Sequence, residues 1–356
     1  MGRFSPGSGL GWKRFAAALL VASSCAVARP KVLVIGVDGL RPDQLGIAST
    51  PAVDELVANG AIALDATNAW TPDETWNGHS ATNWGVLLTG VSPELSGLTQ
   101  NGDAEHTVSD DGWLETLSER EEDLHSAISA ASLGAESERP RTGEVVPTVF
   151  GRLKHRRHDS ETGCFNTWPG IGVAPGTVLG SSRSAVDCFF SPANDDGARS
   201  SAERDRDTID AAVEALTGAG RFGGADVDLT FVHLSQCDAA GHAGDYASEP
   251  YRASIEAADA LIGELLDAID ARATRREEQW LVIVTTDHGG RSDAGEHADN
   301  TDPLVRTIPL IVSADGILPN RIDLSRSSLY DVAPTVLAWL GLPLDEAMPG
   351  TPRARR

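Results

Sequence analysis

The sequence predicts an α/β fold, with a doubly wound, mostly parallel sheet and helices on both faces. Short apolar runs rich in β-branched residues occur at 31–37, 229–236 and 281–286, and such runs are typical of strands buried on both faces of a parallel sheet. Between them lie segments whose apolar residues recur at helical spacing. This alternation of strands and helices favours the doubly wound arrangement.

The other elements follow from local signals along the chain. Pro51 and the pair Asn59-Gly60 bound a helix over 51–59, and a short strand over 61–64 comes next. A further apolar run predicts a strand at 307–313. Apolar residues at helical spacing predict helices at 147–154, 201–217, 250–270 and 329–340.

Composition limits the class of protein. The chain has 356 residues, 41% of them hydrophobic, which is enough for a sizeable core. The formal net charge of -23 at pH 7 argues against nucleic-acid binding through a basic surface. The sequence shows no internal repeat and no clean linker. We therefore expect a single domain over 29–356, with a polar surface insertion near 119–144.

The first 28 residues have the pattern of a secretory signal peptide. Lys13 and Arg14 precede an apolar stretch, and the small residues at 26–28 form a cleavage pattern. The stretch is shorter than the roughly 20 residues that a spanning helix needs. We therefore expect a secreted, extracellular or periplasmic protein with no stable membrane span after cleavage.

An oxidising compartment would permit a disulfide bond. Cys164 and Cys188 lie in one loop-rich stretch and are the natural pair, which would leave Cys237 free at the end of its strand.

Carboxylates and histidines follow three of the predicted strands. Open α/β sheets bind their ligands at the carboxyl edge, so we expect these side chains to meet there. Two ligand sets are expected: Asp238, His242 and His297 for one metal ion, and Asp38, Asp287 and His288 for a second. Mixed carboxylate and imidazole ligands suit Zn²⁺, with Mn²⁺ or Fe as alternatives.

Several motifs of the chain, taken together and in this order, resemble the alkaline phosphatase superfamily, in particular its type I phosphodiesterase/nucleotide pyrophosphatase branch. The motifs are VIGVDGLRPD at 34–43, SATNWGVLLTG at 80–90, CDAAGH at 237–242, VTTDHGG at 284–290 and YDVAPTVLAWLGLP at 330–343. The resemblance implies a hydrolase with two zinc ions and a serine or threonine nucleophile bound to one of them.

The same resemblance points to the nucleophile. In this branch the nucleophile precedes a Thr-Gly pair by a fixed interval, and counting back from Thr89 reaches Ser80. Asn83 then falls where the branch has an asparagine that steadies the phosphoryl oxygen. A helix that begins near Ser80 would also direct backbone N–H groups at an anion. Thr75 and Thr82 are the alternatives.

These observations predict a secreted metal-dependent hydrolase of small-molecule phosphate esters. The sulfatase nucleophile motif is missing, because Ala81 to Trp84 stand where Pro-Ser-Arg would be needed. We expect a phosphodiesterase, because no lysine or arginine lies between Arg41 and Arg120 to bind a dianionic monoester. Trp84 could stack on a substrate ring or pack in the core. The alternatives are an alkaline phosphomonoesterase and a non-catalytic extracellular binding protein.

Overall fold

A computed structural model describes residues 28–69, 78–98, 146–172, 177–192, 199–292 and 295–356. Residues 1–27 of the expected signal peptide, the insertion near 119–144 and Thr75 lie outside these residues. Among the described residues, no helix is long and apolar enough to cross a membrane.

The centre of the fold is a seven-stranded sheet with the order β2-β7-β6-β1-β5-β3-β4. Strands β1 and β3–β6 are mutually parallel, and β7 runs antiparallel to both of its neighbours, β6 and β2. The strands are β1 (Arg29–Val37), β2 (Gly60–Thr67), β3 (Thr162–Asn166), β4 (Cys188–Phe190), β5 (Leu229–Leu234), β6 (Glu278–Thr285) and β7 (Thr307–Ala314). The predicted α/β class with a mostly parallel sheet is confirmed.

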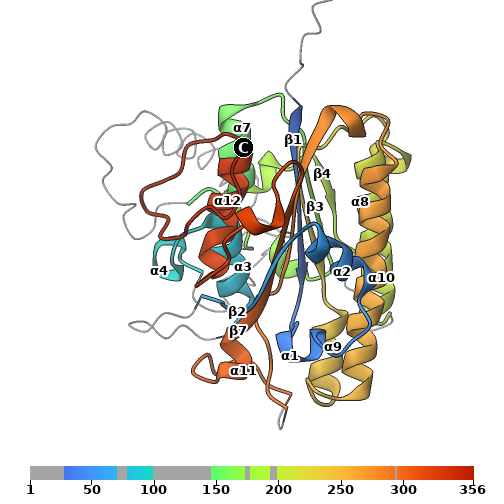
Figure 1. Cartoon of the computed structure of the whole chain (residues 1–356), viewed down its shortest axis with the longest axis vertical. Helices are drawn as coiled ribbons and strands as arrows, with labels where there is room; N and C mark the ends of the chain where they lie inside the picture. The colour runs from blue at the N-terminus through green and yellow to red at the C-terminus, as the bar shows by residue number, and fades with distance from the viewer. Residues whose placement is uncertain (1–27, 70–77, 99–145, 173–176, 193–198, 293–294) are drawn as a thin grey trace, which may run out of the picture.

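Helices cover both faces of this sheet (Figure 1). One face carries α2 (Pro51–Ala58), α8 (Ser201–Thr217) and α10 (Glu249–Asp270), and the other carries α3 (Ser80–Thr89), α7 (Val149–Arg156) and α12 (Val332–Trp339). The short helices are α1 (Pro42–Leu45), α4 (Pro93–Ser96), α9 (Gln236–Ala243) and α11 (Pro303–Arg306). Short 3-10 helices lie at Pro169–Ile171, Gly180–Ala185, Gly220–Phe222, Arg275–Glu277, Pro319–Arg321 and Leu329–Asp331.

Alternate side chains of β1 belong to two hydrophobic cores, one on each face of the sheet. Leu33 and Ile35 pack with apolar residues of α2, α8 and α10, whereas Val32 and Val34 pack with those of α3, α7 and α12. A strand buried on both faces needs an unbroken apolar run, which is the pattern that the sequence shows at 32–37.

The expected disulfide between Cys164 and Cys188 is wrong, since both are free and buried in the structure. Strands β3 and β4 are paired so that Cys164 lies opposite Phe189 and Gly163 opposite Cys188. This register places the two cysteines on opposite faces of the sheet, where each joins a different core. Cys237 is also free and buried.

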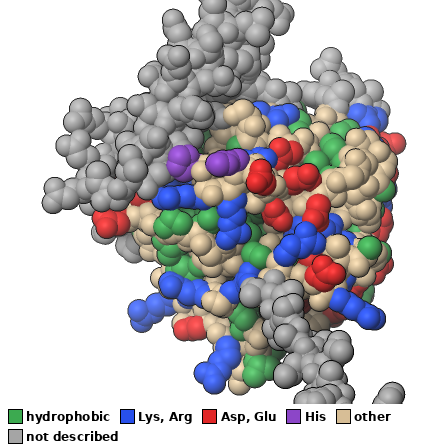
Figure 2. Space-filling view, turned by 90° about the horizontal axis from the view of Figure 1, so that it is seen from above, with side chains coloured by type: hydrophobic (Ala, Val, Ile, Leu, Met, Phe, Trp, Pro, Cys, Tyr) green, Lys and Arg blue, Asp and Glu red, His purple; other side chains and the backbone are tan. Residues whose placement is uncertain are grey.

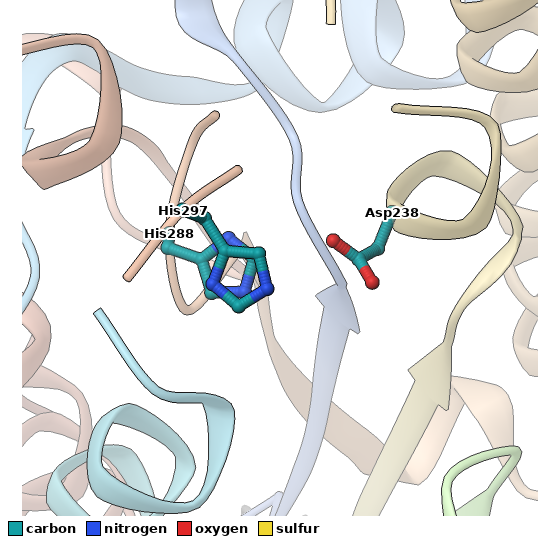
Figure 3. Close-up of side chains that lie close together, drawn as sticks. All are labelled: Asp238, His288 and His297. Carbon is teal, nitrogen blue, oxygen red and sulfur yellow. The ribbon is translucent and has the colours of Figure 1, made fainter. Parts of the chain in front are cut away.

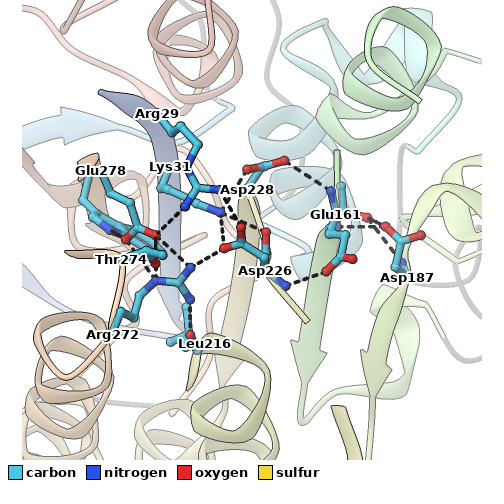
Figure 4. Close-up of polar contacts among 12 residues, drawn as sticks. Arg29, Lys31, Glu161, Asp187, Leu216, Asp226, Asp228, Arg272, Thr274 and Glu278 are labelled. Carbon is cyan, nitrogen blue, oxygen red and sulfur yellow. Dashed lines mark hydrogen bonds and ion pairs between the residues drawn. The ribbon is translucent and has the colours of Figure 1, made fainter. Parts of the chain in front are cut away.

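An ion-pair network closes the amino edge of the sheet (Figure 4). The ammonium of Lys31 lies 2.7 Å from Asp226 Oδ1 and 3.0 Å from Asp228 Oδ1, and Arg272 joins Asp226 to Glu278. In the view onto this end of the molecule, acidic and basic side chains are interleaved (Figure 2). The charges of this network pair with one another, so the network stabilises the starts of the neighbouring strands.

Candidate metal and nucleophile site

The carboxyl edge of the sheet brings the predicted ligands together. Asp38 follows β1, and the pair Asp287-His288 follows β6, which is hydrogen-bonded to β1. Asp238 and His242 lie on α9, which begins directly after β5 on the other side of β1. Neighbouring parallel strands end at the same edge, so residues about 250 positions apart in the sequence become neighbours.

The sequence did not predict α9. It is short, and its residues read as the continuation of the strand before it. The carboxylate of Asp205, from α8, accepts hydrogen bonds from the backbone N–H groups of Ser235 and Gln236 at 2.9 Å each. Burial raises the pKa of Asp205 to about 6, against the lowering effect of its hydrogen-bond donors. This contact fixes the start of α9 and therefore the position of Asp238.

The side chains form two groups of possible metal ligands, and within each group the ligand atoms lie within 4.8 Å of one another. The groups are Asp38 with Asp287 and His288, and Asp238 with His288 and His297. The first group is the set expected from the sequence. The second differs from the expected set, because His288 takes part in it. Figure 3 shows the rings of His288 and His297 together, facing the carboxylate of Asp238, and the rings are stacked with centroids 3.7 Å apart.

His242 completes the second group. Its Nε2 atom lies 3.1 Å from His297 Nε2 and 3.4 Å from Asp238 Oδ2. Two imidazole nitrogens that face each other beside a carboxylate can bind one cation together. All six metal ligands expected from the sequence are therefore close together in the structure.

Backbone carbonyl groups orient two of the imidazoles. His288 Nδ1 lies 2.7 Å from the carbonyl oxygen of Gly289, and His297 Nδ1 lies 2.9 Å from that of Gly78. A carbonyl oxygen only accepts, so Nδ1 is the donor in each ring and Nε2 keeps its lone pair when the ring is neutral. Burial lowers the pKa of both histidines, that of His297 to about 4. Both rings therefore present a neutral nitrogen to the site.

Two of the three carboxylates of this centre have a raised pKa. Burial, together with the charges of Asp287 and Asp238, raises the pKa of Asp38 well above its usual range. Burial and the charge of Asp238 raise the pKa of Asp287 to about 7. Burial also acts to raise the pKa of Asp238, but the surrounding histidines lower it, and His288 has the largest effect among them. The net result is a pKa of Asp238 below its usual value.

Two buried carboxylate oxygens, Asp38 Oδ1 and Asp287 Oδ2, have no hydrogen-bond partner among the described residues. Unpaired buried anions are costly, and a bound cation removes that cost. The donors present therefore fit divalent metal ions.

Ser80 lies beside this centre as the first residue of α3. Its Oγ atom is 3.4 Å from Nε2 of His288, the residue that the two ligand groups share. Thr82, two residues further along the helix, is displaced by about 200° around the helix axis. It is fully buried, and its hydroxyl has no hydrogen-bond partner among the described residues. The structure thus brings Ser80 to the ligand groups and turns Thr82 away from Ser80.

Asn83 is buried and bonded to backbone groups. Its Oδ1 accepts from the N–H of Ala69 at 3.0 Å, and its Nδ2 donates to the carbonyl oxygen of His79 at 3.2 Å. These bonds tie the start of α3 to the segment after β2. The role of Asn83 toward a phosphoryl oxygen remains a prediction.

Trp84 is a core residue and does not stack on a substrate ring. It is fully buried against Phe231 and His233, with ring centroids 5.8 and 5.0 Å away. A Cβ atom at Gly36 of β1 would lie 2.4 Å from the indole ring, so the missing side chain at Gly36 makes room for it. Of the two possibilities for Trp84, packing in the core is the correct one.

Two residues of the site were not expected from the sequence. His233 of β5 lies with Nε2 3.0 Å from Asp38 Oδ2, and the hydroxyl of Tyr246 lies 2.5 Å from Asp238 Oδ1. The run LTFVHL at 229–234 did carry a signal, because an imidazole is unusual in an otherwise apolar strand. No local signal marks Tyr246.

The α/β fold and the grouped carboxylates and imidazoles agree with the family expected from the sequence. A family model described as type I phosphodiesterase / nucleotide pyrophosphatase matches residues 32–329. The chain belongs to this family.

Among solved structures, murine ectonucleotide pyrophosphatase / phosphodiesterase 5 in complex with AMP is similar with a TM-score of 0.51 and 14% identity, over 91% of this chain and 97% of that one. A 2-O GAG sulfatase is similar with a TM-score of 0.59 and 14% identity, over 91% of this chain and 73% of that one. At these identities the likeness shows the fold.

Curated relatives include two 2,3-bisphosphoglycerate-independent phosphoglycerate mutases. The protein from Natronomonas pharaonis is 31% identical over 48% of this chain, and the protein from Streptomyces coelicolor is 35% identical over 40% of it. The matched segments cover 31% and 27% of those relatives, so the chain spans less than a third of their length.

Proposed function

We propose that this protein is a secreted phosphodiesterase that uses Ser80 as its nucleophile. Its cofactors are two divalent metal ions, with Zn²⁺ as the expected metal. The observation that carries the proposal is the position of Ser80 Oγ, 3.4 Å from His288 Nε2, at the junction of two ligand groups. The expected ligands of the two ions are Asp38, Asp287 and His288, joined by Ser80, and Asp238, His242 and His297. Bound metal ions would supply positive charge that favours the ionised serine and stabilises the leaving oxygen.

The reaction follows from where this chain places its groups. The Ser80 hydroxyl gives its proton to solvent, and Oγ forms a bond to phosphorus as the bond from phosphorus to the leaving alcohol oxygen breaks. A proton from solvent completes the alcohol. The intermediate is a diester that joins Ser80 Oγ to the phosphoryl group and its remaining ester group. Water then attacks this phosphorus, the bond from phosphorus to Ser80 Oγ breaks, and the phosphate monoester leaves as the serine hydroxyl is restored. Ser80 begins the ten-residue helix α3, whose first backbone N–H groups favour an anion at this end.

The charges around the site support a diester substrate. Arg41, the arginine closest in sequence to Asp38, is buried and holds the carbonyl oxygen of Gly290 and the hydroxyl of Ser292. The guanidinium of Arg291 lies 3.8 Å from the carboxylate of Asp302. Both arginines therefore have partners, which favours a substrate with a single negative charge over a dianion.

Phosphomonoester hydrolysis is the second candidate. The similarity to phosphoglycerate mutases, whose name refers to phosphate monoesters, favours it. A direct comparison on one zinc-loaded preparation separates the two functions. We expect a higher kcat/KM for bis-(p-nitrophenyl) phosphate than for p-nitrophenyl phosphate, and loss of both activities with a chelator. A preference for the monoester would favour the phosphatase, and no turnover of either ester with metal bound would favour a binding protein.

A further inference from the structure

One oxygen of each of two metal-site carboxylates is already held by a buried protein group. Asp38 Oδ2 lies 3.0 Å from His233 Nε2, and Asp238 Oδ1 lies 2.5 Å from the Tyr246 hydroxyl. In both cases it is the opposite oxygen that faces an imidazole. Asp38 Oδ1 lies 3.4 Å from His288 Nε2, and Asp238 Oδ2 lies 3.4 Å from His242 Nε2.

His233 is rigidly placed. It lies in the middle of the sheet on β5, opposite Gly36 of β1, and is completely buried. The ring of Trp84 packs edge-on against it, with centroids 5.0 Å apart. A carboxylate accepts hydrogen bonds, so Nε2 is the donor to Asp38. The other nitrogen, Nδ1, has no hydrogen-bond partner among the described residues. The hydrogen bond to Asp38 is therefore the polar contact that accounts for a histidine in this apolar strand.

Tyr246 is held as firmly, by contacts with two ligand segments. A Cβ atom at Gly241 or at Gly290 would lie 2.4 Å from its ring. Gly241 precedes His242 on α9, and Gly290 follows the Asp287-His288 pair by two residues. The ring therefore fills the space between these segments, and its hydroxyl points at Asp238.

We propose that His233 and Tyr246 are positioning residues, each of which turns one carboxylate so that a single oxygen faces its metal ion. His233 would serve the ion held by Asp38, Asp287 and His288, and Tyr246 the ion held by Asp238, His242 and His297. Without the buried donor, the carboxylate can rotate and must leave an oxygen unpaired. Groups that orient metal ligands in this way typically change metal affinity 10- to 100-fold. The inference rests on the proposed two-metal site.

The test is zinc titration of the full chain against a competing chelator. We expect Tyr246→Phe to weaken one of two zinc ions by about 10- to 100-fold and His233→Leu to weaken the other by a similar factor. His233→Gln keeps an N–H donor at nearly the same place and should restore much of the affinity. Tyr330→Phe removes a buried tyrosine hydroxyl whose bond goes to the carbonyl oxygen of Ala69, and this control should leave both affinities unchanged.

Double variants separate positioning from a general loss of structure. His233→Leu should have no further effect on zinc binding in an Asp38→Ala background, and Tyr246→Phe none in an Asp238→Ala background. Wild-type affinities in both single variants would overturn this inference and leave the proposed function standing. Equal losses in Tyr246→Phe and Tyr330→Phe would overturn it as well. A wild-type protein that binds no zinc would overturn the proposed function and this inference together.

Discussion

Replacing Lys31 by methionine should destabilise the protein without changing its chemistry. The Lys31 side chain is fully buried, and its ammonium contacts Asp226 Oδ1, the carbonyl oxygen of Asp226 and Asp228 Oδ1 at 2.7, 2.8 and 3.0 Å. Methionine keeps the length of the chain and removes the charge. Lys31 precedes Asp38 by seven residues of extended strand, a separation of about 23 Å from the metal ligands.

The size of the effect follows from the exposure of the partners. Removal of one member of a fully buried ion pair typically costs about 3–5 kcal/mol. Here the side chains of Asp226 and Asp228 are 42% and 22% exposed, so water can solvate part of the charge that is left. Asp226 also keeps its ion pairs with Arg29 and Arg272. We therefore expect a loss of about 2 kcal/mol in the free energy of unfolding.

Urea unfolding at pH 7 measures this loss, with an unchanged m-value as the sign that the compactness of the unfolded state is the same. The control is Arg206→Met, which removes an exposed i,i+4 pair with Asp210 and an ion pair with Glu264. Such exposed pairs contribute about 1 kcal/mol or less. The kcat/KM of Lys31→Met should equal that of the wild type. A loss no larger than in the control, or a several-fold fall in kcat/KM, would refute the reasoning.

Three further predictions concern the site and its support. Ser80→Ala should lower kcat at least about 1,000-fold while both metal ions stay bound, and Thr82→Ala should keep most of the activity; the reverse pattern would identify Thr82 as the nucleophile. Asp238→Ala and Asp287→Ala should each lose one of two metal ions, which elemental analysis measures, and retention of both would disprove the ligand assignment. The pKa of Asp205 is raised to about 6, so the folded state holds this proton more tightly than the unfolded state. Its contribution to the free energy of unfolding is therefore greatest below the usual pKa of about 4 and falls by about 3 kcal/mol as the pH rises from 4 through 6. Asp205→Asn should remove this pH dependence when unfolding is measured from pH 4 to 7.

The pattern of the sequence was sufficient for most of the fold. An apolar run rich in β-branched residues, such as 32–37, is typical of a strand buried on both faces of a sheet. The spacing of Ile255, Ile262 and Leu265 gives a helix one apolar side to bury. The proximity of the expected ligands was also predictable, because residues that follow neighbouring parallel strands meet at one edge of the sheet. The short helix α9 gave no such signal, because it follows β5 so closely that its residues read as part of that strand.

The sequence by itself therefore determined the fold class, and it predicted which carboxylates and histidines lie together at the candidate metal site. The tertiary structure decided which side chains touch. It separated Cys164 from Cys188 across the sheet, placed Trp84 in the core, and brought His233 and Tyr246 to the carboxylates. Such contacts depend on strand register and on the orientation of side chains far apart in the chain, because a shift of one residue turns a strand side chain to the opposite face.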